Sequence, residues 1–254
     1  MLPSAKPGPL KRLFAPATLA AIAVAALLVA AVCGALVAVW MAEGPGLPHA
    51  AGPARLELAS RIEIRLRGEI GEGTAHHLRQ LLRAHPEVRL LSLSSDGGLV
   101  DEAEQMGDTV AALGLSTYVP DGCLSACTLV FVRGRERLVA SSGRLGFHAP
   151  WEWDETGSQP VEVSAEQERQ AYVAAGIAPD FAAEAVRVPS SDMWYPERER
   201  LIAAGVATDF VDSADLPDRL ARLPPQRRRA AALPAGRGVY RGQTSRLATE
   251  SAFS

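Results

Sequence analysis

Two side chains with the chemistry of an acyl-transfer site lie 23 residues apart in this sequence. Ser125 opens an apolar stretch that runs to Val132, and His148 follows a short apolar segment. A serine hydroxyl becomes a nucleophile when a nearby histidine takes its proton. Serine is also a common N-cap of helices, and a single histidine is often structural. The pair therefore indicates acyl transfer only if the fold brings the two residues together.

Backbone N–H groups near these side chains are the second chemical feature. The pair Gly97-Gly98 follows Ser94-Ser95-Asp96 at the end of an apolar run. Glycine lets a chain turn sharply and present N–H groups into a cleft, although many such turns carry glycine for packing alone. The N–H after Ser125, at the start of a helix, can help to hold an oxyanion.

The cysteines form the third feature, because Cys123 and Cys127 lie two residues on either side of Ser125. If this part of the chain is exported, the pair can form a disulfide that fixes the serine turn. Two buried free thiols or a reactive Cys127 are the alternatives. The remaining cysteine, Cys33, lies in an apolar run. Two cysteines do not supply the four ligands of a structural zinc site, and we expect no metal and no other cofactor.

Charge and lysine content exclude several classes of protein. The 254 residues carry a formal charge of -3, yet the first 42 carry three cations and no acid, so the remainder is acidic. A nucleic-acid-binding domain would be basic, and we therefore expect no nucleic acid partner. Lys6 and Lys11 are the only lysines. Their position excludes a P-loop ATPase and a Ser–Lys hydrolase in the rest of the chain.

An uncharged apolar run, residues 13–42, is long enough to cross a bilayer as a helix. The cations before it favour a cytoplasmic tail of residues 1–12 and export of everything after the helix. A cleaved signal peptide is the alternative, although its apolar core is usually shorter. Residues 43–54 are rich in Gly, Pro and Ala and are predicted to be a linker. We expect a single-pass membrane protein with its domain on the extracytoplasmic (periplasmic) side.

Patterns of strands and helices alternate through residues 55–215, which indicates parallel βαβ units and the α/β class. Strands are predicted at 61–67, 88–93, 116–119, 137–139, 145–147 and 206–211. Helices are predicted at 71–84, 99–113, 125–132, 164–175, 179–187 and 196–204. Residues 216–254 carry several prolines, glycines and arginines and are predicted to be a mostly disordered basic tail, with a helix near 226–232.

The order of these segments resembles the proteolytic subunit of the Clp proteases, and more closely its exported, membrane-anchored relatives. The resemblance covers residues 61–150 in the order strand, Gly-Gly turn, helix, strand, serine at a helix start, strand pair and histidine. It resumes at 191–211, SDMWYPERERLIAAGVATDFV. The resemblance implies the spiral of βαβ units that Clp protease subunits share with the crotonase superfamily.

The resemblance also implies a triad and two oxyanion donors at matching positions. Ser125 matches the nucleophile, His148 the base and Asp192 the acid that orients the base. The N–H groups of Gly98 and Ala126 match the oxyanion hole. These roles imply a membrane-anchored serine peptidase that needs no metal or nucleotide, acts on peptides or unfolded proteins and forms a homo-oligomer.

Several alternatives stay open. Asp154 and Asp180 are within reach as the third member of the triad. The same fold serves crotonase-type acyl-thioester enzymes, although export counts against a cytosolic thioester, and an inactive binding or scaffold domain would keep the same pocket. For Trp151 and Trp153 we expect one of two roles: they line a substrate groove, or they contact a partner or the membrane.

Overall fold

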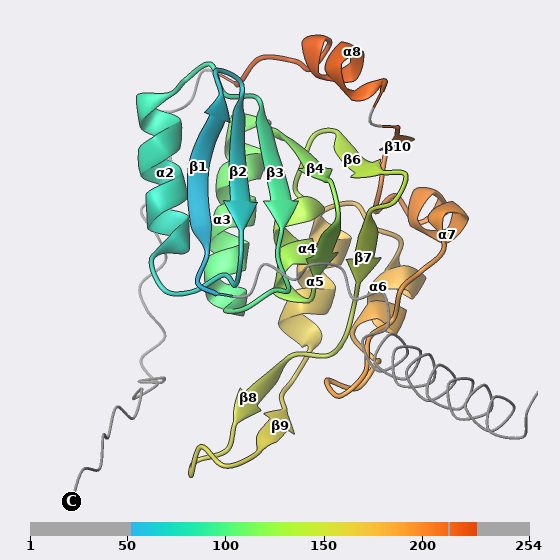
Figure 1. The fold of residues 1–254 in the computed structure, drawn as a ribbon. Helices are drawn as coiled ribbons and strands as arrows, with labels where there is room; N and C mark the ends of the chain where they lie inside the picture. The colour runs from blue at the N-terminus through green and yellow to red at the C-terminus, as the bar shows by residue number, and fades with distance from the viewer. Residues whose placement is uncertain (1–51, 213, 228–254) are drawn as a thin grey trace, which may run out of the picture. The chain divides into compact units, whose positions relative to one another are not determined.

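A six-stranded sheet organises the computed structural model, which describes residues 52–212 and 214–227 (Figure 1). The strands lie in the order β1-β2-β3-β4-β6-β10. Their bounds are Arg55–Ser60 for β1, Glu63–Arg67 for β2, Leu90–Ser94 for β3, Ser116–Val119 for β4, Arg137–Ala140 for β6 and Asp209–Val211 for β10. β1 and β2 pair antiparallel, and the other neighbours in this sheet pair parallel. The predicted α/β class with a mainly parallel sheet is confirmed.

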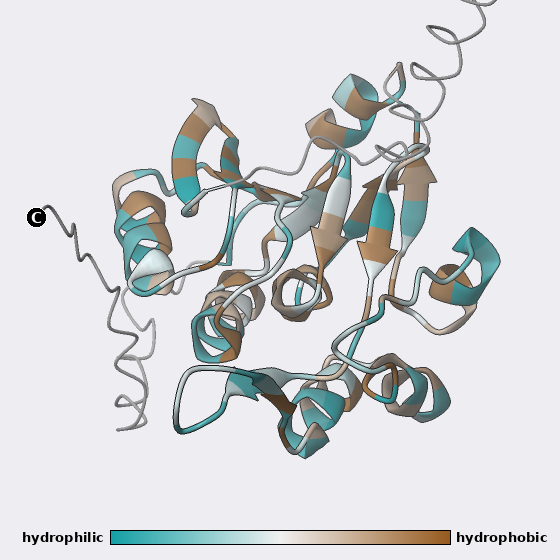
Figure 2. Ribbon diagram, turned by 60° about the horizontal axis from the view of Figure 1, so that its bottom comes forward, coloured by the Kyte–Doolittle hydropathy of each residue, from teal (hydrophilic) through white to brown (hydrophobic). Residues whose placement is uncertain are grey.

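Helices lie on both sides of this sheet (Figure 2). Their bounds are Thr74–Ala84 for α2, Val100–Leu113 for α3, Ala126–Phe131 for α4, Glu166–Ala174 for α5, Pro179–Ala185 for α6, Arg198–Ala203 for α7 and Leu216–Ala221 for α8. Successive strand residues point to opposite faces of the sheet and so supply two cores. Leu91 and Val139 belong to the larger core with α2 to α6, whereas Leu90 and Leu138 belong to a smaller one that α8 covers.

A second run of strand pairings lies just beyond the carboxyl ends of the parallel strands. β5, Gly122–Leu124, pairs parallel with β7, Arg144–Gly146. Isolated bridges extend the run on both sides, joining Ile70 to Gly98, Ser95 to Cys123 and Phe147 to Trp194. Segments that are far apart in the sequence therefore lie side by side, and Gly98, Ser125, His148 and Asp192 lie in them or within two residues of them.

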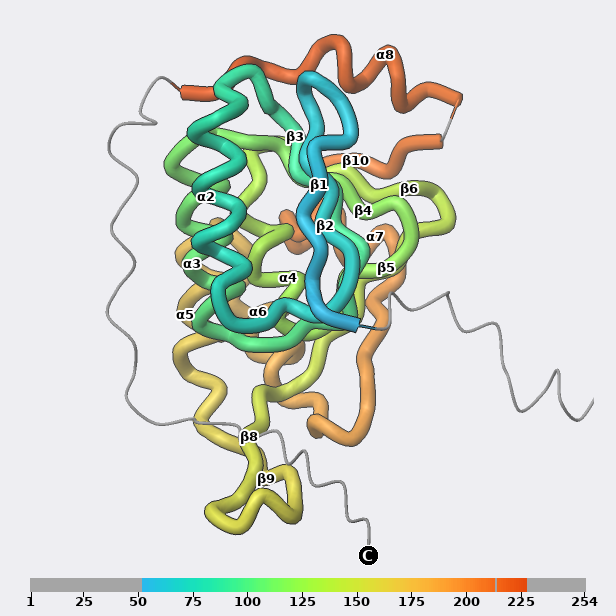
Figure 3. The backbone as a smooth tube through the Cα atoms, turned by 60° about the vertical axis from the view of Figure 1, so that its left-hand side comes forward, coloured from blue at the N-terminus to red at the C-terminus, as the bar shows by residue number. Residues whose placement is uncertain are grey.

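An antiparallel hairpin formed by β8, Trp151–Trp153, and β9, Pro160–Glu162, projects from the sheet in Figures 1 and 3. The Asp154 carboxylate closes its turn by accepting the N–H groups of Thr156 and Ser158 at 3.1 and 2.8 Å. This hairpin, β5 and β1 are absent from the prediction. Strands of three residues show little alternation by themselves, although the equally short β7 and β10 are predicted, and β1 is missed despite its six residues.

The predicted disordered tail differs from the structure over residues 216–227. Here α8 and the residues after it pack on the smaller core, where Leu223 is buried. The Arg89 guanidinium donates to the Leu223 carbonyl oxygen at 2.9 Å, and the Arg227 N–H donates to Leu113 at 2.7 Å. Leu216, Leu220 and Leu223 are spaced to pack on one side, but prolines and arginines lie between them and the segment as a whole is polar. The prediction of disorder was therefore wrong for residues 216–227.

The predicted cytoplasmic tail (1–12), membrane helix (13–42) and most of the linker (43–54) lie outside the described residues. Within residues 52–212 and 214–227, no helix is both long and apolar enough to cross a bilayer. Residues 228–254 of the predicted tail also lie outside the described part.

Candidate active site

Ser125 lies between β5 and α4 in a backbone conformation that side chains rarely adopt. Its φ is 52° and its ψ is -130°, and it is the only described residue other than glycine with a positive φ. Such a conformation costs about 1–3 kcal/mol. The Ser125 N–H donates to the Gly146 carbonyl oxygen at 2.9 Å, which ties this turn to β7. Hydrolases use a strained strand-to-helix turn of this kind to expose a nucleophile.

The peptide group between Ser125 and Ala126 is held through its carbonyl. The Ser125 carbonyl oxygen accepts the Thr128 N–H at 2.9 Å and the Thr128 hydroxyl at 2.7 Å. In a trans peptide the C=O and the N–H point in opposite directions, so the Ala126 N–H points away from Thr128. Among the hydrogen bonds of the described residues, this N–H has no acceptor.

The peptide group between Gly97 and Gly98 is held in the same way. The Gly97 carbonyl oxygen accepts the Ile70 N–H at 2.7 Å, and the Leu99 N–H donates to Ile70 at 2.8 Å. The Gly98 N–H therefore points away from Ile70, and it too lacks an acceptor within the described part of the chain. Two free donors thus flank the serine turn.

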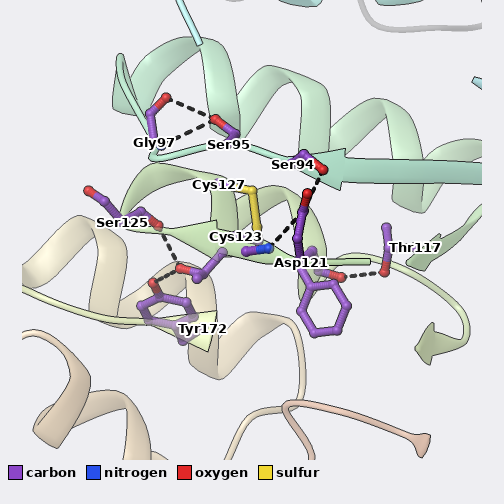
Figure 4. Close-up of a disulfide and its surroundings, with 12 residues drawn as sticks. Ser94, Ser95, Gly97, Thr117, Asp121, Cys123, Ser125, Cys127 and Tyr172 are labelled. Carbon is purple, nitrogen blue, oxygen red and sulfur yellow. Dashed lines mark hydrogen bonds between the residues drawn. A yellow bond between two sulfur atoms is a disulfide. The ribbon is translucent and has the colours of Figure 1, made fainter. Parts of the chain in front are cut away.

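Glycine is required at both positions of this turn. Gly97 has a φ of 112° and Gly98 a φ of 127°, values that other residues rarely adopt. A Cβ on Gly97 would lie 2.8 Å from the Ser125 Cβ and 3.1 Å from the Ala126 nitrogen. Figure 4 shows Gly97 opposite Ser125, with the Ser95 hydroxyl bonded to it. The glycine turn therefore faces the serine with bare backbone.

His148 follows β7 and is half-buried. Its Nδ1 lies 2.6 Å from the Ala149 carbonyl oxygen. A carbonyl only accepts, so Nδ1 carries the proton in this contact and Nε2 keeps the lone pair that a general base needs. Phe147, fully buried against Phe181 with ring centroids 5.2 Å apart, fixes the backbone beside it. No hydrogen bond among the described residues joins His148 to Ser125.

Asp192 lies on the segment next to His148 and is exposed. Phe147 and Trp194 exchange two backbone hydrogen bonds of 2.9 Å, which place residues 192–194 alongside residues 147–149. The Asp192 carboxylate accepts the Met193 N–H at 2.7 Å. Within the described ranges no hydrogen bond connects it to His148.

The two alternative acids are engaged elsewhere. Asp154 closes the turn of the β8–β9 hairpin, and its hydrogen bonds there lower the pKa of its carboxyl group. Asp180 pairs with Arg200 at 3.0 Å, and this hydrogen bond likewise lowers its pKa. Of the three acids, Asp192 is the one whose backbone the fold aligns beside the histidine segment.

Cys123 and Cys127 form a disulfide, with their Cα atoms 5.3 Å apart (Figure 4). Both residues are fully buried. The bridge spans the serine turn from the middle of β5 to the second residue of α4. It therefore links the two elements whose junction sets the conformation of Ser125.

Sequence reasoning missed Thr128 and Tyr172, which lie directly behind the serine turn. Their hydroxyl oxygens are 2.6 Å apart, and Tyr172 is buried. Burial raises the pKa of the Tyr172 hydroxyl well above its usual range, which keeps it protonated. A polar threonine within the apolar run of residues 126–132 was a visible signal for Thr128. Nothing local marks Tyr172, which lies 44 residues further along the chain.

Among known proteins, this chain is similar to solved structures in its fold but matches none by sequence family. No family model and no curated protein sequence matches this chain. An Asn-to-Asp variant of ClpP1 from Listeria monocytogenes is similar with 14% sequence identity and a TM-score of 0.47, over 61% of this chain and 94% of that one. A Ser-to-Ala variant of the membrane-bound stomatin-specific protease 1510-N is similar with 15% identity and a TM-score of 0.47, over 64% and 86%.

Proposed function

We propose that this chain is a serine peptidase in which Ser125 is the nucleophile, His148 the general base and Asp192 the residue that orients the base. One observation carries the proposal: two peptide groups beside Ser125 have their carbonyls held and their N–H groups free. An oxyanion hole needs such preorganised donors, which bind the charge that develops in the transition state. Gly98 and Ala126 supply them.

The reaction follows from these positions. Ser125 Oγ attacks the carbonyl carbon of a peptide bond while His148 Nε2 takes the hydroxyl proton. The carbonyl oxygen becomes an oxyanion and accepts the N–H groups of Gly98 and Ala126. The C–N bond then breaks as the imidazolium gives its proton to the leaving amine. Water, activated by the same histidine, hydrolyses the Ser125 ester and regenerates the enzyme.

Asp192 takes its role when its carboxylate replaces the Ala149 carbonyl as the acceptor of the His148 Nδ1 proton. The two backbone hydrogen bonds between Phe147 and Trp194 support this exchange, because they hold the segment of Asp192 next to that of His148. The carboxylate would hold the imidazole and stabilise its charged form better than a neutral carbonyl does.

The wider context is part of the same proposal. Residues 13–42 anchor the chain in the membrane, the domain works on the extracytoplasmic side, and the substrates are peptides or unfolded proteins. Copies of the chain assemble into a homo-oligomer. The apolar run with its preceding cations supports the anchor, and the similarity to the Clp proteolytic subunit motivates the assembly.

Labelling with a fluorophosphonate tests the chemistry, because this reagent modifies only an activated serine. The full chain, purified in detergent, should be labelled on Ser125, and Ser125→Ala and His148→Ala should abolish labelling. Asp192→Asn should leave partial labelling. The matched control Ser142→Ala changes an exposed serine in the turn before β7 and should label like the wild type.

An unlabelled wild-type chain would refute the peptidase and would favour an inactive binding domain that keeps the pocket. Labelling that persists in Ser125→Ala would refute the nucleophile. In this structure His148 Nδ1 contacts the Ala149 carbonyl oxygen and not Asp192. Labelling therefore tests whether the triad forms in the working protein.

A further inference from the structure

Two hydroxyl groups in series reach the Ser125 carbonyl from helix α5 (Figure 4). Tyr172 on α5 lies 2.6 Å from the Thr128 hydroxyl oxygen, which in turn lies 2.7 Å from the Ser125 carbonyl oxygen. A carbonyl only accepts, so the single proton of Thr128 goes to Ser125. The Tyr172 hydroxyl must then donate to Thr128. The series thus has one direction, from Tyr172 through Thr128 to Ser125.

The series is sealed from water and rigidly mounted. Thr128 is fully buried, and Tyr172 is 5% exposed. The Tyr172 ring packs edge-on against Phe147, the residue before His148, with ring centroids 6.0 Å apart. Because no solvent can replace a lost partner here, each hydroxyl is a strong constraint on its neighbour.

We propose that Thr128 and Tyr172 are positioning residues that keep the Ala126 N–H directed at the substrate oxyanion. The argument rests on the proposed function and on the planarity of the peptide group. Rotation of the Ser125–Ala126 plane would turn the carbonyl away from Thr128 and the N–H away from the oxyanion together. Such a rotation leaves the φ of Ser125 at 52° but moves its ψ away from -130° towards the left-handed helical region, which is less strained at this φ, and the two hydroxyls oppose it.

Isosteric variants of the full chain in detergent test this role. Thr128→Val removes the hydroxyl but keeps the side-chain shape and the backbone N–H bond to Ser125. We expect kcat for p-nitrophenyl butyrate to fall about tenfold with KM unchanged, and the rate of fluorophosphonate labelling to fall by a similar factor. This loss is smaller than the 10²–10³ that follows complete removal of an oxyanion donor. Thr128→Ser should restore most of both rates.

Tyr172→Phe removes only the far end of the series and is the second variant in case Thr128→Val fails to fold. It should lower both rates about threefold, because Thr128 keeps its own bond to Ser125. Since the two hydroxyls act in series, the double variant should be no slower than Thr128→Val alone. Additive losses in the double variant would overturn the series.

Matched controls separate positioning from general stability. Thr109→Val removes another buried hydroxyl, one that donates to the Gln105 carbonyl oxygen at 2.9 Å within α3. Tyr118→Phe removes a tyrosine hydroxyl on the opposite face of the sheet. Both controls should keep wild-type kcat.

The outcomes distinguish the two proposals. Wild-type kcat and labelling in Thr128→Val, or equal losses in Thr109→Val, would overturn the positioning role while the peptidase stands. An unlabelled wild-type chain would overturn the peptidase and the positioning role together.

Discussion

Ser125 adopts a conformation that glycine reaches at less cost. The values of 52° for φ and -130° for ψ are the mirror image of the extended region and are typical of glycine in tight turns. The strain is local to one residue, and the bonds from Gly146 and Thr128 maintain it. Stability is thus given up at the one position where the orientation of a hydroxyl and of the next N–H matters.

We predict that Ser125→Gly is more stable than Ser125→Ala by about 1 kcal/mol. Alanine keeps the strain, whereas glycine removes it and loses only part of the gain to its greater freedom when unfolded. Urea unfolding of both variants measures the difference, and Ser125→Ala should unfold close to the wild type. A glycine variant less stable than the alanine variant would contradict the strain.

Glu168 is a buried acid next to the hydroxyl series, and its Oε2 has no hydrogen-bond partner in the described part of the chain. Burial raises the pKa of this carboxyl group, and the charges of Glu104 and Asp101 add to the effect. Folding therefore favours the protonated form. The contribution of protonated Glu168 to the free energy of unfolding is fully present below the ordinary pKa of glutamate. It is lost as the pH rises through the raised pKa of Glu168.

Glu168→Gln should therefore raise the thermal midpoint at pH 7 to 8 and give no gain near pH 4. Thermal unfolding followed by circular dichroism across this range measures it. The control is Glu166→Gln in the same helix, where an exposed carboxylate pairs with Arg169 at 2.6 Å and has its pKa lowered to about 2. That control should show no gain at pH 7 to 8, and a pH-independent effect of Glu168→Gln would refute the buried charge.

At the scale of elements, the glycine turn between β3 and α3 performs two separable tasks. Gly98 lies against Ile70, three residues after β2, and a Cβ added to Gly98 would be 2.2 Å from the Ile70 carbonyl oxygen. Gly97 instead faces the serine turn. One residue therefore joins the turn to the strand run, and the other leaves space beside the nucleophile.

Substitutions should separate these tasks. Gly98→Ala should lower the free energy of unfolding by at least about 2 kcal/mol, because backbone atoms must move apart at a strained φ. Gly97→Ala should lower fluorophosphonate labelling more than tenfold while costing less stability, since its Cβ meets the Ser125 side chain. Urea unfolding measures the stability of both variants and fluorophosphonate labelling their reactivity. A larger loss of stability in Gly97→Ala than in Gly98→Ala, or unchanged labelling in Gly97→Ala, would refute the assignment.

The elements also show how far sequence reasoning reaches. Helices such as α3, with apolar residues at helical spacing, and the buried strand β3 were predictable because they are long enough to show a period. β5, β8 and β9 have three residues each and were not predicted. Length is not the whole reason, because β7 and β10 are equally short and were predicted, and the six-residue β1 was missed. Gly98 was recognisable because its glycine pair follows a predicted strand, and Ser125 because it begins a predicted apolar helix. Tyr172 was not, because only the packing of α5 against α4 brings it to the site.

For the whole molecule, the proposed anchor leads to a test of topology. The uncharged run of residues 13–42 follows three cations, so we predict one membrane crossing with the remaining chain exported. Protease added to intact spheroplasts should digest the domain, while a cytoplasmic marker protein stays whole. Complete protection of the domain until the membrane is lysed would contradict this topology.

The covering of the smaller core has a consequence for how the chain matures. The side of the sheet formed by Leu90, Tyr118 and Leu138 is closed by α8 and Leu223, near the end of the described residues. During synthesis, a chain folding from its N-terminus therefore carries a bare apolar surface until these last segments emerge. Release of a shortened product ending at residue 215 would make that exposure permanent and expose a surface prone to aggregation. The folded chain is therefore protected from aggregation through this surface only once its C-terminal segment has been made and has packed on the sheet.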